Sequence, residues 1–190
     1  MPQTEYHKDI ENPLQLRLSL RFPLKYAIAL YKFSKNGRVQ HLLHELKYGN
    51  HPEIGIALGT ICAERLTEAK LNKCFDMIIP VPLHASRKRT RGYNQSSKFA
   101  AGISAALSIP FSDDLLIRNL KTETQTRKSK LNRWENMNNV FGLTTRANFK
   151  GSRILLVDDV ITTGSTLEAC SEVLLRAGCA ELSIACIAEA

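Results

Sequence analysis

The sequence predicts an α/β protein in which helices cover both faces of a central, mostly parallel sheet, a three-layer α/β/α arrangement. Three observations favour this fold. Apolar runs typical of buried strands alternate with apolar-periodic helices through the second half of the chain. The strongest run, Ile-Leu-Leu-Val at 154–157, has the continuous apolar character of a strand that is buried on both faces. A length of 190 residues suits one domain with a substantial core.

The other elements follow from the same patterns. Apolar residues at 26–31 and 77–82 predict two strands. Gly37 and Pro52 mark the starts of two amphipathic helices, which should end near residues 49 and 69. The remaining expected elements are a short edge element at 14–23, a helix at 94–107, extended segments at 115–117 and 140–143, a helix ending near residue 176, and a strand at 182–187. We treat residues 1–190 as one domain and expect residues 1–13 to be flexible.

The composition is that of a globular protein, with 44% hydrophobic and 23% charged residues. No run is long and apolar enough to cross a membrane, and the first dozen residues lack the apolar core of a signal peptide. The five cysteines are scattered and form no Cys-x-x-Cys pair, which is typical of a reducing compartment. We therefore expect a cytoplasmic location.

The net charge of +8 is concentrated in two segments. Residues 83–98 contain five basic residues and no acid, and residues 118–133 contain six basic residues and one acid. One such segment alone would usually be solvated surface charge. Two of them favour a polyanionic ligand, either nucleic acid or a small molecule rich in phosphates.

The segment after the strongest strand has the composition of a binding site. Asp158 and Asp159 come directly after the apolar run, and a small, hydroxylated turn leads from them into a helix. The turn consists of Thr162, Thr163, Gly164, Ser165 and Thr166. Backbone N–H groups at such a helix start attract phosphate, and carboxylates nearby can accept hydrogen bonds from vicinal hydroxyls. The segment therefore suits a ribose 5-phosphate; the alternative is an ordinary helix cap within a Thr/Ser-rich turn.

This segment resembles the motif with which type I phosphoribosyltransferases bind 5-phosphoribosyl-1-pyrophosphate (PRPP). Two further strings are similar to the ComF family, which includes the ComFC and GntX types of phosphoribosyltransferase-like proteins. They are Ile-Pro-Val-Pro-Leu-His at 79–84 with Arg-Gly-Tyr-Asn-Gln at 91–95, and a pattern running from Arg118 through Gln125 and Arg133 to Val-Phe at 140–141. The resemblance implies a type I phosphoribosyltransferase fold.

The resemblance also implies roles for the basic segments. The segment after Pro82 would form a loop that binds pyrophosphate, through Arg87, Arg89 and Arg91. The second segment would be a flexible loop that closes over the site and carries Gln125 and Arg133. Members of the ComF family commonly have an N-terminal four-cysteine zinc module. No cysteine precedes Cys62, so we expect no such module here.

The implied function is that of a Mg²⁺-dependent enzyme, which transfers the 5-phosphoribosyl group from PRPP to an unidentified nitrogenous acceptor and releases pyrophosphate. Asp158 and Asp159 would hold the ribose hydroxyls or the Mg²⁺ ion, in part through water. The alternative is a non-catalytic protein that binds PRPP or a nucleotide and engages single-stranded DNA during natural transformation. Tyr93 and Trp134 could stack on a base or pack within the protein. The oligomeric state is left open, with a homodimer among the alternatives.

Overall fold

A four-stranded parallel sheet forms the centre of the protein. The computed structural model describes residues 1–118 and 140–190. The strands are β1 (Ala27–Lys32), β2 (Met77–Pro80), β5 (Arg153–Ile161) and β6 (Glu181–Glu189), in the spatial order β1-β6-β5-β2. All of their pairings are parallel. The predicted α/β class with a parallel sheet is confirmed.

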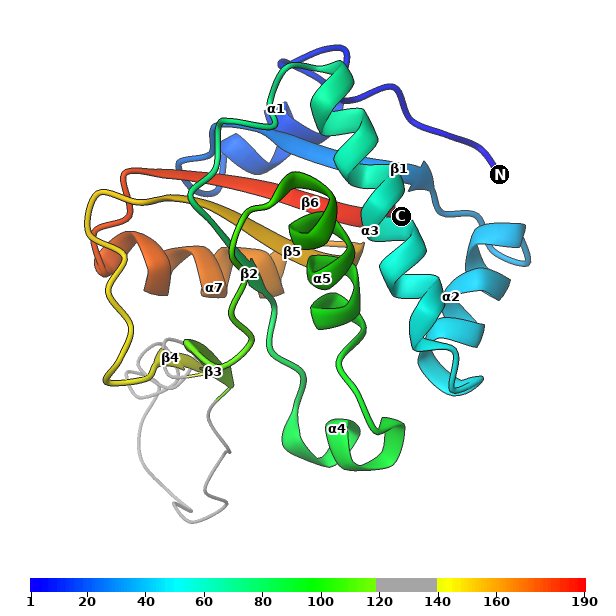
Figure 1. Ribbon diagram of the computed structural model, residues 1–190. Helices are drawn as coiled ribbons and strands as arrows, with labels where there is room; N and C mark the ends of the chain where they lie inside the picture. Colours follow the sequence, from blue (N-terminus) through cyan, green and yellow to red (C-terminus); the bar gives the residue numbers. More distant parts are fainter. Residues whose placement is uncertain (119–139) are drawn as a thin grey trace, which may run out of the picture.

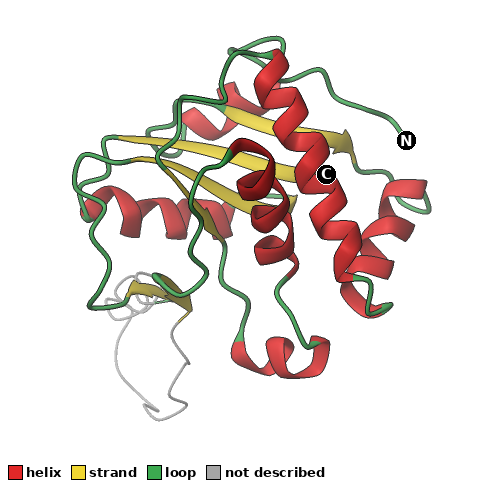
Figure 2. Cartoon of the chain, in the orientation of Figure 1, coloured by secondary structure: helices red, strands yellow, loops and turns green. Residues whose placement is uncertain are grey.

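Helices lie on both faces of this sheet (Figures 1 and 2). One face carries α2 (Arg38–Tyr48), α3 (Pro52–Glu68) and α5 (Gln95–Leu107), and the other carries α1 (Pro13–Ser19) and α7 (Ser165–Arg176). Side chains alternate along β5, so Leu155 and Val157 join the first apolar layer while Ile154 and Leu156 join the second. This is the three-layer arrangement that the sequence predicts.

Two short elements lie beyond the sheet, at the lower end of the view in Figure 1. The antiparallel pair β3 (Leu116–Arg118) and β4 (Phe141–Leu143) agrees with the predicted extended segments. The basic segment after Pro82, which was expected to be a loop, contains the short helix α4 (Ala85–Arg91). The loop prediction was wrong because no residue of α4 is buried, so the sequence shows no apolar period there.

The N-terminal part of the chain also differs from expectation. Residues 14–23 do not form an edge element, because the helix α1 occupies residues 13–19. The Asn12 side chain accepts a hydrogen bond from the backbone N–H of Gln15 (3.0 Å), and Pro13 stands at the first helical position. Leu14 and Leu18, one turn apart, are fully buried against the sheet. The alternation of Leu and Arg in this stretch therefore belongs to a helix and not to the predicted edge element.

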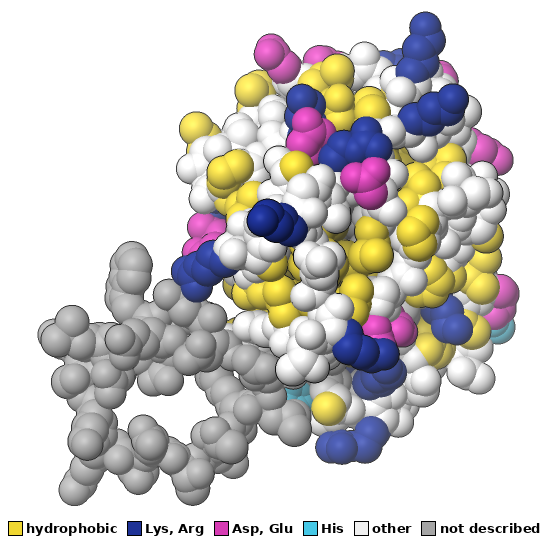
Figure 3. Space-filling model, turned by 60° about the vertical axis from the view of Figure 1, so that its left-hand side comes forward, with side chains coloured by type: hydrophobic (Ala, Val, Ile, Leu, Met, Phe, Trp, Pro, Cys, Tyr) yellow, Lys and Arg dark blue, Asp and Glu magenta, His cyan; other side chains and the backbone are white. Residues whose placement is uncertain are grey.

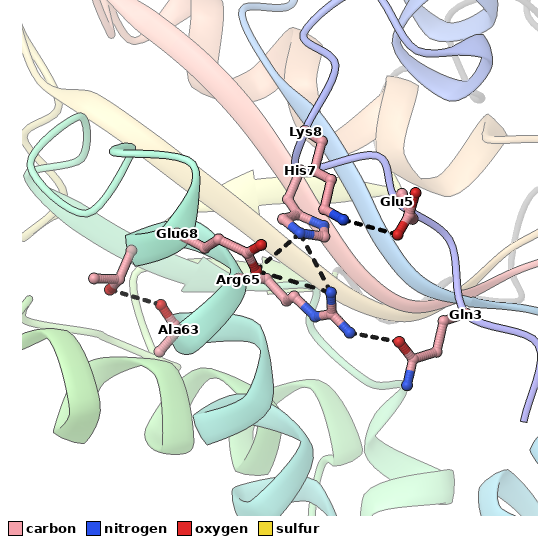
Figure 4. Close-up of polar contacts among 8 residues, drawn as sticks. Gln3, Glu5, His7, Lys8, Ala63, Arg65 and Glu68 are labelled. Atoms are coloured by element: carbon pink, nitrogen blue, oxygen red, sulfur yellow. Dashed lines mark hydrogen bonds and ion pairs between the residues drawn. The ribbon is translucent and has the colours of Figure 1, made fainter.

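Residues 1–13, which we expected to be flexible, make defined contacts. The Thr4 N–H donates to the Leu30 carbonyl (3.0 Å), which attaches the segment to the free edge of β1. The buried His7 ring lies against α3, with Nε2 3.2 Å from a Glu68 oxygen and 3.3 Å from an Arg65 nitrogen (Figure 4). Burial and the neighbouring Arg65 lower the pKa of His7 and favour its neutral ring. Residues 1–13 are therefore held in place by contacts with β1 and α3.

The contact between α3 and α5 positions the start of α5, which reaches the functional site. The two helices approach backbone to backbone at two glycines. A Cβ at Gly102 would collide with the Ile56 carbonyl oxygen, and one at Gly59 would collide with the Phe99 carbonyl oxygen. No helix within the described ranges is long and apolar enough to span a membrane.

Gly102→Ala should lower the free energy of unfolding by about 1–3 kcal/mol, since overpacking outweighs the gain in helix propensity of about 1 kcal/mol. Urea denaturation measures the difference. Thr60→Ala, at an exposed position of α3, is the matched control and should stay close to wild type. A Gly102→Ala protein as stable as wild type would show that the two backbones are not in tight contact.

Candidate functional site

A cavity of about 190 Å³ opens at the carboxyl ends of β2 and β5. Its charged lining comes from four elements that lie far apart in the sequence. These residues are Lys47 of α2, Arg87 and Arg91 of α4, Arg118 of β3, and Asp158 and Asp159 of β5. Gln95 and Ser96 at the start of α5 complete the polar wall. Ligand sites of open parallel sheets lie at this edge.

A smaller hollow of about 30 Å³ adjoins the cavity, and Asp158, Val160 and Thr166 line both. The turn at 162–166 forms this hollow. Gly164 has φ of +80° and is the N-cap of α7. The side chains of the turn's hydroxyl residues are exposed, and the Thr163 and Ser165 hydroxyl oxygens lie 3.0 Å apart. An anion in the hollow would meet the positive end of a twelve-residue helix.

Asp158 and Asp159 lie within β5, which continues to Ile161. This differs from the expected strand end at Val157, because the pairing with β6 runs on through Asp158 and Val160. Asp158 Oδ1 accepts hydrogen bonds from the Ser96 hydroxyl (3.0 Å) and from the Asp159 N–H (2.8 Å). Both carboxylates therefore lie near the carboxyl end of a central strand whose backbone is still hydrogen-bonded to β6. This placement is more rigid than a loop would provide.

The two carboxylates have different electrostatic surroundings. Burial, and then the charge of Asp159, raise the pKa of Asp158 to about 7. Asp159 instead forms an ion pair with Lys47, whose ammonium nitrogen lies 2.8 Å from Oδ2. Lys47 thus supplies a positive charge beside the acid pair within the cavity.

The arginines of α4 divide between two faces of the helix. Arg87 and Arg91 are one turn apart and line the cavity, whereas Arg89 is not among the lining residues. Arg91 donates to Gln95 Oε1 and to the Tyr48 hydroxyl, both at 3.1 Å, and its guanidinium lies 4.9 Å from the centre of the Tyr48 ring. All three arginines were expected to bind pyrophosphate from one loop. In the helix α4, Arg89 lies on a different face from Arg87 and Arg91 and does not line the cavity with them.

Gln95 carries a polar group that has no protein partner in the described part of the chain. Its side chain is buried, and its Oε1 accepts from Arg91, while Nε2 has no acceptor among the described residues. The reverse orientation of the amide would place its N–H groups against the guanidinium, which has only donors. Gln95 lines the cavity, so a ligand oxygen is the natural partner for Nε2.

Sequence reasoning missed Lys47, Gln95 and Ser96 as site residues. The sequence around Lys47 shows only that it lies in a predicted amphipathic helix, next to the buried Leu46. That pattern does not indicate that the Lys47 side chain reaches the acid pair. Gln125 and Arg133 lie outside the described residues, and Arg118 is the last described residue before them. Among the residues described, no group of three or more His, Cys, Asp or Glu side chains could hold a metal. Two carboxylates fit Mg²⁺ only if a ligand or water supplies the other oxygens.

Comparisons with known proteins show the family of the chain. Residues 47–190 match the phosphoribosyl transferase domain family. The chain is 36% identical over 163 residues to competence protein F of Haemophilus influenzae, covering 85% of this chain and 66% of the relative. It is 34% identical over 152 residues to the DNA utilization protein YhgH of Escherichia coli K12, covering 77% and 65% respectively. The chain thus spans about two thirds of the length of these relatives.

The solved structure of glutamine PRPP amidotransferase from B. subtilis has a similar fold. The TM-score is 0.52 at 22% identity, and the match covers 75% of this chain and 30% of that one. At this identity the similarity concerns the fold alone. The family of the chain is shown by the family model together with the curated relatives. The chain belongs to the phosphoribosyl transferase domain family, and its curated relatives carry the names of competence and DNA utilization proteins.

Proposed function

We propose that this protein is a Mg²⁺-dependent phosphoribosyltransferase, which transfers the 5-phosphoribosyl group of PRPP to a nitrogenous acceptor and releases pyrophosphate. One observation carries the proposal. The acid pair, the arginines of α4 and the hydroxylated turn border two adjoining hollows at one edge of the sheet. PRPP presents a diol, a diphosphate and a phosphate, and the site offers a complementary group for each.

The reaction displaces pyrophosphate from the anomeric carbon, and positive charge develops on the ribose ring. Asp158 and Asp159 accept hydrogen bonds from the 2- and 3-hydroxyls and stabilise that charge. The backbone N–H groups of the turn at 162–166 hold the 5-phosphate. Arg87 and Arg91 neutralise the leaving pyrophosphate. Bound Mg²⁺, held by the two carboxylates and ligand oxygens, would add positive charge next to the pyrophosphate.

Neighbouring residues orient this machinery. Ser96 fixes Asp158 through a direct hydrogen bond of 3.0 Å, and Lys47 fixes Asp159 through the ion pair. Gln95 holds Arg91 and offers its unpartnered Nε2 to a ligand oxygen. Because these contacts exist in the free protein, little reorganisation is needed when PRPP binds.

PRPP with Mg²⁺ should raise the melting temperature of the wild-type protein, and Asp158→Asn or Asp159→Asn should abolish most of that rise. Asparagine keeps an oxygen that can accept the existing backbone and Ser96 bonds, but it removes the charge. Thermal denaturation measures the shift. Asp113→Asn is the control, since Asp113 is exposed and outside the cavity lining. An undiminished shift in both site variants would remove the role assigned to the carboxylates.

Turnover separates an enzyme from a binding protein. Nucleobases and amines are screened with PRPP while pyrophosphate release is followed. At least one acceptor should release pyrophosphate with wild type and fail with Asp159→Asn. PRPP binding without release from any acceptor would instead favour the second candidate function.

The second candidate is a non-catalytic PRPP- or nucleotide-binding protein that engages single-stranded DNA during natural transformation. The names of the relatives, competence protein F and DNA utilization protein YhgH, favour it. So does the outer surface of α4, where Lys88 and Arg89 are exposed beside the cavity. In Figure 3 several Lys and Arg side chains gather at the lower end of the visible face, at the level of α4 in Figure 1. Such a surface suits a phosphate backbone.

DNA binding should depend steeply on salt and on the outer residues of α4. Replacing both Lys88 and Arg89 by Gln should reduce the slope of log K against log salt by about 1.4, since each phosphate contact on a single strand contributes about 0.7. Fluorescence anisotropy with a labelled oligonucleotide gives this slope, and the PRPP-induced melting shift should stay unchanged. No binding of the oligonucleotide at low salt would exclude this function.

A further inference from the structure

The turn at 162–166 is held by a residue from the distant N-terminal part of the chain. Arg21, which follows α1, donates through Nη1 to the Thr163 carbonyl oxygen. Its Nη2 lies 3.3 Å from the Ser165 hydroxyl oxygen and 2.5 Å from Glu168 Oε2. One guanidinium group thus contacts the backbone of the turn, a side chain of the turn and the first turn of α7.

The helix α1, which precedes Arg21, packs directly on this turn. A Cβ at Gly164 would lie only 2.8 Å from the Leu18 Cδ2 atom, and Gly164 has φ of +80°. Leu18 is fully buried, so it has little room to move away. The C-terminal end of α1 therefore sits against the segment that is expected to bind phosphate.

The hydrogen bond to Thr163 fixes one peptide group of the turn. In a trans peptide the carbonyl and the following N–H point in opposite directions. Because the Thr163 carbonyl faces Arg21, the Gly164 N–H points away from it. An N–H group whose direction is set before binding does not have to be ordered by the ligand.

Arg21 also neutralises an acid that is badly placed for phosphate binding. Glu168 lies in the first turn of α7, at the end where an anion would bind. An unpaired carboxylate there would repel a phosphate group. The ion pair with Arg21 removes this repulsion while leaving both side chains about one third exposed.

We propose that Arg21 is a positioning residue for the sugar-phosphate end of the ligand: it orders the turn at 162–166 and neutralises Glu168. The inference rests on the proposed function for the identity of the ligand. Arg21 lies outside residues 47–190, the range that matches the family. The N-terminal segment therefore contributes to the site through α1 and Arg21.

The test compares two probes that occupy different halves of the site. Calorimetry measures the affinities of ribose 5-phosphate and of inorganic pyrophosphate, each with Mg²⁺. Arg21→Met should weaken ribose 5-phosphate binding about five- to tenfold and leave pyrophosphate binding unchanged. Adding Glu168→Gln to Arg21→Met should recover part of the loss, because the uncompensated acid is gone. Arg17→Met is the matched control, since Arg17 lies one turn earlier on α1 and pairs with Glu189 at 3.1 Å instead.

Hydrogen exchange of the ligand-free protein gives a readout that needs no ligand. Amides of residues 162–168 should exchange faster in Arg21→Met than in wild type or Arg17→Met, and Arg21→Lys should be intermediate. Unchanged exchange together with unchanged ribose 5-phosphate affinity would overturn the proposal, as would an equal loss of affinity for both probes. If wild type binds neither probe, the proposed function fails, and exchange alone then decides whether Arg21 orders the turn.

Discussion

The parallel pairing of β2 with β5 is the constraint on which the site depends. Pro80 stands opposite Val157, and the Val81 N–H donates to the Val157 carbonyl at 2.9 Å. The next residue of β5 is Asp158, and the chain beyond β2 leads at once into α4. Because parallel strands end at the same edge, this register places the basic helix α4 beside the acid pair, although the paired residues Ile79 and Leu156 are 77 positions apart in the sequence. A slip of one residue would turn the carboxylates to the opposite faces.

Opposite charges can share this small cavity because they are paired before any ligand arrives. Lys47 faces Asp159, Ser96 bonds Asp158, and Gln95 together with Tyr48 holds Arg91. Two neighbouring carboxylates without such partners would be costly to bury. Gln95 Nε2 has no partner among the described residues, and Gln95 lines this cavity, so a ligand oxygen there would supply the missing acceptor. These contacts are present in the protein without any ligand.

The core of the fold and the carboxylate motif could be predicted from the sequence because each has a local signal. Apolar runs and helical periods indicated β1, β2, β5, β6, α2, α3, α5 and α7, and their order implied a parallel sheet. The helix α1 was missed because its signal is an Asn12 cap and two buried leucines among arginines. The helix α4 was missed because it buries nothing. Misreading α4 as a loop placed Arg89 with Arg87 and Arg91, which only the helical period separates.

Contacts between distant segments explain what could not be predicted. Nothing local to Lys47 or Arg21 indicates that these side chains reach Asp159 and Thr163, since both contacts depend on how α1 and α2 pack on opposite faces of the sheet. A motif describes the segment that touches the ligand. The residues that orient such a segment come from wherever the fold brings another element against it.

A crystal structure of the protein with ribose 5-phosphate, pyrophosphate and Mg²⁺ tests the central claim most directly. The account predicts the sugar phosphate in the turn at 162–166, its hydroxyls on Asp158 and Asp159, and pyrophosphate against Arg87 and Arg91. Phosphate groups bound only to the outer face of α4, with no ligand contact to Asp158 or Asp159, would contradict it.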